Sequence, residues 1–209
     1  MYYGGGDRYV HADIHQVAFR PENSNAIAVT SDGGIFYSDN ALSGSQTSFI
    51  ERNQGYNTLQ FYTCDITSND YGENIFVGGL QDNGTLISGF LLDDYNIHDI
   101  GDMITGGDGA YCFFDNNDNL LMTSTYYNAW YFINTDTFEY GYNNNNSGVF
   151  INPADYDSNN NTLYANKVRF NGSQNQRIII IDDINVNNLD SGINVSTLNL
   201  NTGTSVYYS

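Results

Sequence analysis

Basic residues are scarce in this sequence: six lysines and arginines stand against 24 aspartates and glutamates, which gives a formal net charge of -18. A surface of that charge repels the phosphates of nucleic acids and the anionic head groups of membranes, so neither is an expected partner. It attracts cations, and Ca²⁺ is the expected ion for an oxygen-rich extracellular chain. The simpler alternative is that the charge serves solubility alone.

Long apolar runs and cysteines are also few. No run approaches the ~20 apolar residues of a membrane span, so we expect no membrane insertion. Residues 1–6 lack the basic and apolar regions of a signal peptide, which indicates either that a signal has been removed or that the sequence is a segment of a longer chain. Cys64 and Cys112 are the only cysteines. We expect two unpaired, buried thiols, and a disulfide bridge formed in an oxidising compartment is the alternative.

Helical periodicity is absent as well, because no stretch keeps apolar residues at i, i+3, i+4 and i+7 over three turns. Aromatic and turn-forming residues are abundant instead: the chain has 18 Tyr, 12 Phe and 21 Gly, with only two Pro. Tyr and Phe favour pleated, half-buried surfaces, and Gly suits tight turns. The sequence therefore predicts an all-β protein.

Four similar units follow one another along the chain, each predicted to hold four short antiparallel strands. Their length of roughly 40–50 residues is that of a four-stranded β-propeller blade. We expect one domain over residues 1–209, with blades at about 11–54, 55–104, 105–146 and 147–203. The predicted strands are 15–20, 26–31, 34–39 and 47–52; 59–67, 74–80, 85–90 and 96–100; 109–115, 120–127, 129–135 and 137–142; and 148–156, 162–168, 176–184 and 194–200.

The turns inside the units support this division. The only two prolines, Pro21 and Pro153, are each predicted to follow the first strand of a unit and to lead through an Asn/Asp-rich turn into the second strand. The other two units are expected to make the same turn through residues 68–70 and 115–118. Asn and Asp suit these turns because they tolerate a left-handed backbone and bond to their own turns.

A recognisable turn motif lies between the second and third strands of the first unit. It reads Thr30-Ser31-Asp32-Gly33-Gly34-Ile35-Phe36-Tyr37. We expect Asp32 to accept backbone N–H bonds inside a tight hairpin, Gly34 to supply a positive φ, and Tyr37 to pack over the turn. A weaker copy, Gln81-Asp82-Asn83-Gly84-Thr85, keeps the aspartate and the glycine two residues later.

The first motif resembles the Asp-box, or BNR repeat, with Thr30, Asp32, Gly34 and Tyr37 as its structural residues. Beyond it, residues 11–15, 60–62, 78–85 and 106–109 are similar to secreted bacterial propellers of the sortilin-like, xyloglucanase-like and photosystem II assembly factor-like kinds. The resemblance implies a ring of seven or eight blades. Because four blades are fewer than such a ring needs, we expect a partial propeller whose exposed blade faces are covered, with a second copy of the chain as the hypothesis.

Two histidines and an aspartate near the start of the first unit are candidate metal ligands. His11, Asp13 and His15 have the i, i+2, i+4 spacing of one strand face. Imidazole and carboxylate groups on one face suit a transition metal if another element completes the shell. The alternative is a hydrogen-bonded ladder without a metal.

Acidic residues between the second and third units are candidate catalytic or binding groups. Asp102 and Asp108 are expected to flank Gly106 and Gly107 in a flexible loop, and with Asp13 and Asp82 to converge near a central channel. Paired carboxylates of this kind, here Asp13 and Asp108, suit acid/base work on a glycosidic bond. They are equally compatible with Ca²⁺ binding or with turn capping.

Aromatic residues of the third unit are expected to form core, with a sugar-stacking platform as the alternative; they are Tyr126, Tyr127, Trp130 and Tyr131. The isoleucines at 178–181 are typical of a strand buried on both faces. The candidate ligand-binding residues are His11, His15, Asp82, Asp102 and Trp130.

The expected function is that of a secreted or cell-surface propeller that recognises a polysaccharide or an extracellular protein. The alternative is a glycoside hydrolase, or an inactive relative, that uses two channel carboxylates. A sialidase is not expected, because the arginines match no motif for binding a substrate carboxylate. Fold analogy by itself is weak support for any of these functions.

Overall fold

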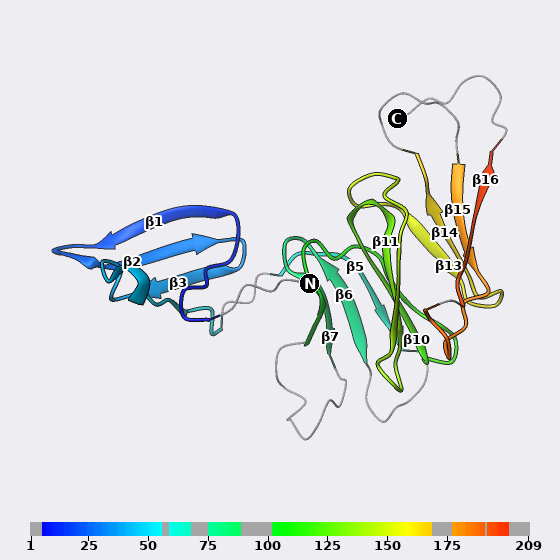
Figure 1. Cartoon of the computed structure of the whole chain (residues 1–209), viewed down its shortest axis with the longest axis horizontal. Coiled ribbons are helices and arrows are strands. Elements are labelled where there is room, and N and C mark those ends of the chain that lie inside the picture. Colours follow the sequence, from blue (N-terminus) through cyan, green and yellow to red (C-terminus); the bar gives the residue numbers. More distant parts are fainter. Residues whose placement is uncertain are drawn as a thin grey trace. The chain divides into compact units, whose positions relative to one another are not determined.

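The structure is a computed structural model that describes residues 6–55, 59–67, 75–88, 102–168, 177–190 and 192–200. Contacts between residues divide the chain into two compact units, Met1–Gln60 and Phe61–Ser209. Each unit is described below by itself, and Figure 1 shows both.

The described chain is all-β, as the sequence predicts. It forms four separate four-stranded antiparallel sheets, each with its strands in simple up-and-down order. The only helical elements in the described ranges are two short 3₁₀ turns, η1 at Gly44–Gln46 and η2 at Tyr126–Asn128. No helix in this part of the chain is long and apolar enough to cross a membrane. The strands are β1 Ile14–Arg20, β2 Asn23–Ser31, β3 Gly34–Ser38 and β4 Ile50–Glu51; β5 Phe61–Ile66, β6 Phe76–Leu80, β7 Gly84–Ser88 and β8 Asp102–Thr105; β9 Cys112–Phe114, β10 Leu120–Thr125, β11 Ala129–Asn134 and β12 Tyr140–Asn144; and β13 Ala154–Asp157, β14 Thr162–Asn166, β15 Arg177–Asp182 and β16 Asn194–Asn199.

Each sheet falls in one predicted repeat, apart from β8, which ends one residue beyond the predicted boundary at 104. The main error in strand placement concerns this same strand. The predicted strand at 96–100 lies outside the described residues, and the fourth strand of the sheet is β8, in a segment predicted to be a loop. The predicted turn at 68–70 also lies outside them, as do the predicted strand ends at 74, 90 and 176.

The prediction for the second proline is wrong. Pro21 follows β1 as expected, but Pro153 precedes β13. A proline fits just before a strand because it has no N–H to give to the ladder. The turn between β13 and β14 instead relies on Asn161, whose φ is 49°, just as Asp118, with φ 58°, serves the β9–β10 turn. Asp and Asn therefore supply the left-handed residue of these two turns, whereas in the β1–β2 turn Glu22 supplies it, with a φ of 63°.

The first unit is one sheet, β1 to β4. Val29 and Phe36 face each other across β2 and β3, and both are buried. The Tyr9 ring meets Phe36 edge-on, with the centroids 6.0 Å apart. Strand β1 is exposed along its whole length.

The second unit contains the other three sheets, which pack face to face through two apolar clusters. One cluster joins β6 and β7 to β9 and β10, and its residues are Ile75, Val77, Ile87, Cys112, Phe114 and Leu121. The other joins β10 and β11 to β14 and β15; it includes Leu120, Met122, Trp130, Phe132, Leu163, Ala165, Ile179 and Ile181. The middle sheet, β9 to β12, is therefore covered on both faces.

This packing corrects one expectation about burial. In β15, Ile179 and Ile181 are fully buried while Ile178 and Ile180 are half-buried, so the strand is not buried equally on both faces. The strand buried on both faces is β10, all six residues of which are buried. The second half of β10 consists of Thr and Ser, so a search of the sequence for apolar runs does not find this strand.

Both cysteines are free thiols, as expected, but only Cys112 is buried. Burial is the main cause that raises the pKa of the Cys112 thiol to about 11. Cys64 is exposed, contrary to the prediction, because it lies on the face of β5 that packs against no other sheet of the second unit.

Candidate functional site

The β2–β3 turn of the first unit, which lies in the motif at residues 30–37, joins the two strands through Asp32 and Gly33, with Ser31 paired to Gly34. Asn53 clamps this turn: its Oδ1 accepts the Ile35 N–H at 2.7 Å, and its Nδ2 donates to the Gly33 carbonyl at 2.7 Å. Two features favour glycine at position 34. Its φ is +105°, and a Cβ there would lie 2.1 Å from Asn53 Oδ1.

Two other expectations for the motif change. Among the described residues the Asp32 carboxylate accepts a hydrogen bond from His15 Nε2 and none from a backbone N–H, so the turn-holding role passes to Asn53. Tyr37 lies half-buried on β3 with the Arg52 guanidinium 5.9 Å from its ring centroid, and the fully buried aromatic is its neighbour Phe36. Thr30 lies in β2, paired with Ile35.

The premise that His11, Asp13 and His15 share one strand face is wrong. Strand β1 begins at Ile14, and Asp13 before it has a left-handed φ of 57°. His11 packs on the turn instead, where its ring would clash with a Cβ at Gly33. His15 hydrogen-bonds to Asp32, so both histidines contact the β2–β3 turn.

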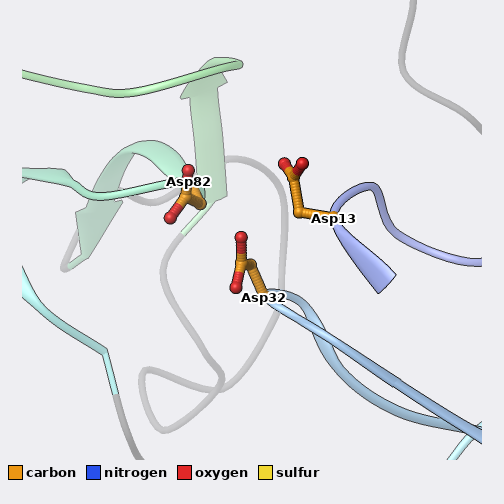
Figure 2. A group of neighbouring side chains, drawn as sticks. All are labelled: Asp13, Asp32 and Asp82. Atoms are coloured by element: carbon orange, nitrogen blue, oxygen red, sulfur yellow. The ribbon is translucent and has the colours of Figure 1, made fainter. Parts of the chain in front are cut away.

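Asp13 and Asp32 are the carboxylates of this region, at the start of β1 and in the β2–β3 turn (Figure 2). Their closest ligand oxygens lie within 4.8 Å of each other. Ca²⁺ takes six to eight oxygen ligands, and two carboxylates, one already bonded to His15, are too few for a site within the first unit.

In the second unit, the structure brings together Asp82 and Asp108, two of the predicted site residues. Asp82 lies in the β6–β7 turn (Figure 2) with a φ of 59°, and Asp108 lies between β8 and β9. The Asp82 N–H donates to Asp108 Oδ1 at 3.2 Å. Burial, followed by the charges of Asp108 and Asp82, raises the pKa of the Tyr62 hydroxyl, so this tyrosine lies in the field of both carboxylates.

Asp102 does not join this pair. It is exposed in β8 and pairs with Ile87, whereas Asp108 is bridged to Gly84 at the other end of β7, three residues or about 10 Å away. The segment after β8 is also not the flexible loop that was predicted. Gly84 N donates to the Gly107 carbonyl at 2.7 Å, and Gly109 N donates to the Leu80 carbonyl at 2.9 Å, which ties the connection to the β6–β7 turn.

Trp130, a predicted ligand-binding residue, is completely buried. Its ring stacks on Phe113 with the centroids 6.3 Å apart and the planes 17° from parallel. Its indole N–H donates to Asn128 Oδ1 at 3.4 Å. Trp130 is therefore core, as the alternation of side chains along a strand led us to expect, and its choice as a ligand-binding candidate is wrong.

Three other aromatic residues of the second unit form an exposed cluster, here called the ring cluster: Tyr126, Tyr127 and Phe150. Their exposed fractions are 43%, 37% and 44%. Tyr126 and Phe150 are parallel, with centroids 5.5 Å apart and planes 2° apart. Tyr127 meets both edge-on, at 5.8 Å and 5.7 Å. Two of these residues were considered in the sequence analysis, and Phe150 was not.

A hydrogen-bond network of buried asparagines joins the two segments that carry the ring cluster. Asn152 Nδ2 donates to Asn128 Oδ1 at 2.6 Å, and Asn128 Nδ2 donates to the Asn166 carbonyl at 2.7 Å. Asn152 Oδ1 accepts the Val149 N–H at 2.9 Å. Asn128 and Asn152 are 0% and 3% exposed. The network therefore links the turn that carries Tyr127 to the segment that carries Phe150.

The ring cluster and the acidic pair lie along one edge of the second unit, here called the site edge and made of residues 81–83, 106–109, 126–128 and 145–152. Tyr126 lies against Gly107, where a Cβ would be 3.3 Å from Tyr126 Cε1. Tyr127 N donates to the Phe150 carbonyl at 3.1 Å. The rings and carboxylates thus come from four different connections, and the connection that carries Asp108 lies against Tyr126 at Gly107.

Sequence reasoning missed three residues that shape these sites: Asn53, Asn152 and Phe150. Asn and Phe at such positions match no motif, and an asparagine-rich chain hides its few buried asparagines among many exposed ones. Comparison of the sequence with protein-family models and with curated proteins finds no match. The Asp-box resemblance therefore stays a sequence-based prediction.

Proposed function

We propose that the four sheets are consecutive blades of a β-propeller of the Asp-box type and that the chain is an extracellular module that recognises polysaccharides. Support for the fold comes from the sheets themselves. All four are four-stranded, antiparallel and in up-and-down order, and those of the second unit pack face to face. This is the local construction of propeller blades.

The observation that carries the recognition function is the site edge. Here exposed rings lie beside two carboxylates, on a backbone held away from ordinary conformations. Tyr127 has a φ of 58°, a conformation that is strained for tyrosine, and strain of this kind is concentrated at functional sites. Asp82 and Asn128 have φ values of 59° and 58°, which Asp and Asn tolerate. A rigid surface of rings and carboxylates matches the apolar faces and hydroxyl groups of sugars.

Hydrolysis of the glycosidic bond is the second function that the sequence suggested, and the geometry favours it less. Of the two carboxylates that the sequence analysis paired for catalysis, Asp13 belongs to the first unit and Asp108 to the second. Within the second unit, Asp108 Oδ1 accepts the Asp82 N–H and so helps to hold a turn. We therefore propose binding without catalysis.

The test is affinity electrophoresis of the whole chain in gels that contain soluble polysaccharides. Retardation by at least one of xyloglucan, mixed-linkage glucan or galactomannan is expected, with no release of reducing sugar. Release of reducing sugar that is lost in Asp108→Asn would replace the proposal with a hydrolase. A chain that binds none of the polysaccharides and instead captures a purified extracellular protein would overturn the polysaccharide function.

We also retain the hypothesis that a second copy of the chain covers an exposed blade face. The face of the β13–β16 sheet opposite the core carries two large apolar residues, Tyr164 and Leu198, that are 38% and 45% exposed. The other face of the same sheet packs on a like sheet, which supports a like partner here. Light scattering over a dilution series tests this, and a monomer at every concentration would contradict it.

A further inference from the structure

We infer that the ring cluster Tyr126–Tyr127–Phe150 is the sugar-stacking subsite of the chain and that it takes a neutral pyranose of a polysaccharide. This inference deepens the proposed function and rests on it. The sugar contact is therefore assigned not to Trp130, which is buried, but to Tyr126 and Phe150, which two different connections bring together.

The geometry of the pair fits a flat apolar ligand. Tyr126 and Phe150 are parallel to within 2° and each is more than two-fifths exposed. Parallel rings offer parallel apolar faces, and the C–H-bearing face of a pyranose ring stacks on such a face. Tyr127 stands edge-on to both rings and closes one side of the pair. Tyrosine supplies contact area with few rotatable bonds, so little side-chain entropy is lost on binding.

The subsite is organised before any ligand arrives. Tyr127 and Asn128 both have a φ of 58°, a conformation that asparagine tolerates and that is strained for tyrosine. The buried bonds between Asn128, Asn152 and Asn166 hold this turn. Two further backbone bonds connect it to the next segment, from Tyr127 N to the Phe150 carbonyl and from Ser147 N to the Tyr127 carbonyl. Preorganisation lowers the cost of binding.

Charge selects the class of sugar. The net charge is -18, and Gly107, against which Tyr126 lies, directly precedes Asp108 in the sequence. Asp108 and Asp82 repel the carboxylates of uronic acids and the sulfates of sulfated glycans. Their oxygens accept hydrogen bonds from the hydroxyl groups of a neutral sugar. The subsite is therefore expected to bind neutral polysaccharides and to reject polygalacturonate.

The experiment compares the whole wild-type chain with Tyr126→Ala/Phe150→Ala by affinity electrophoresis in xyloglucan, mixed-linkage glucan, galactomannan and polygalacturonate. We expect retardation of the wild type by a neutral polysaccharide only. Loss of both rings is expected to weaken this binding at least about tenfold, as for a residue at the centre of an interface. Tyr126→Leu/Phe150→Leu keeps apolar volume without flat rings and is expected to lose binding to a similar extent.

The matched control is Phe138→Ala/Tyr140→Ala, which removes one phenylalanine and one tyrosine that are 44% and 65% exposed. Both lie where β11 connects to β12, at the other end of β11 from Tyr126 and Tyr127. Its binding should equal that of the wild type. Unchanged fluorescence of Trp130 shows that each variant is folded. Wild-type binding that survives in both ring variants would overturn this subsite and leave the proposed function standing. Failure of the wild type to bind any neutral polysaccharide would overturn both.

Discussion

Replacement of Asn152 by alanine tests whether the buried asparagine network holds the site edge. Its side chain makes four bonds of 3.1 Å or less: Nδ2 donates to Asn128 Oδ1 at 2.6 Å and to the Asn166 carbonyl at 2.8 Å, while Oδ1 accepts from Val149 N at 2.9 Å and Asn166 Nδ2 at 3.1 Å. At about 1 kcal/mol for each bond, the free energy of unfolding should fall by about 4 kcal/mol.

The single tryptophan makes the assay direct, because Trp130 lies in the same unit and bonds to Asn128. Urea unfolding is followed by its fluorescence. With a slope of about 2 kcal/mol per molar urea, the transition midpoint should fall by about 2 M. Asn159→Ala is the control, since Asn159 is exposed and its hydrogen bond to Asp157 Oδ1 is donated by the backbone N–H; its midpoint should move by less than about 0.25 M. A shift below about 0.5 M in Asn152→Ala, at an unchanged slope, would refute the reasoning.

Three further predictions concern a turn, the thiols and an exposed carboxylate. Gly34→Ala should destabilise the first unit by at least about 1 kcal/mol, since φ is positive there; equal rates of proteolysis for variant and wild type would contradict this. One thiol per chain, the exposed Cys64, should react rapidly with Ellman's reagent at pH 8, whereas Cys112, buried and with a pKa of about 11, should react only on unfolding. A side-chain bond from Asn160 lowers the pKa of Asp157, so its stabilising contribution is present above the ordinary carboxyl pKa and is lost as pH falls through the lowered value. Asp157→Asn should therefore be less stable than wild type at neutral pH and match it at low pH, as measured by urea unfolding.

The strand pattern was largely predictable from the sequence, because a strand and its turn are local features. The division into repeated units of four strands located β6, β10, β11 and β14 to within a few residues, and Asn or Asp with a left-handed backbone marked several turns. The fourth strand of the second sheet was misplaced because Asp102 and the glycines after β8 suggested a loop. Pairing of β8 with β7 outweighs those local preferences.

The candidate site was predictable only in part. Tyr126 and Tyr127 were considered as a platform, and Asp82 and Asp108 were expected to converge. Trp130 was a candidate because exposure cannot be judged from residue type alone. Phe150 was missed because its position beside Tyr126 depends on where a long connection crosses the turn.

By itself, the sequence determined that this protein is built of short antiparallel strands in four groups of four, with acidic and amide side chains in the turns. Alternation, glycine spacing and the absence of helical periodicity are local properties, and they suffice for that. Only the tertiary structure decided which rings are core and which are exposed, and that Asn53, rather than Asp32, holds the β2–β3 turn. Those outcomes depend on contacts between residues far apart in the chain, where the packing of one sheet on the next, and the close approach of one turn to another, select partners that no local pattern encodes.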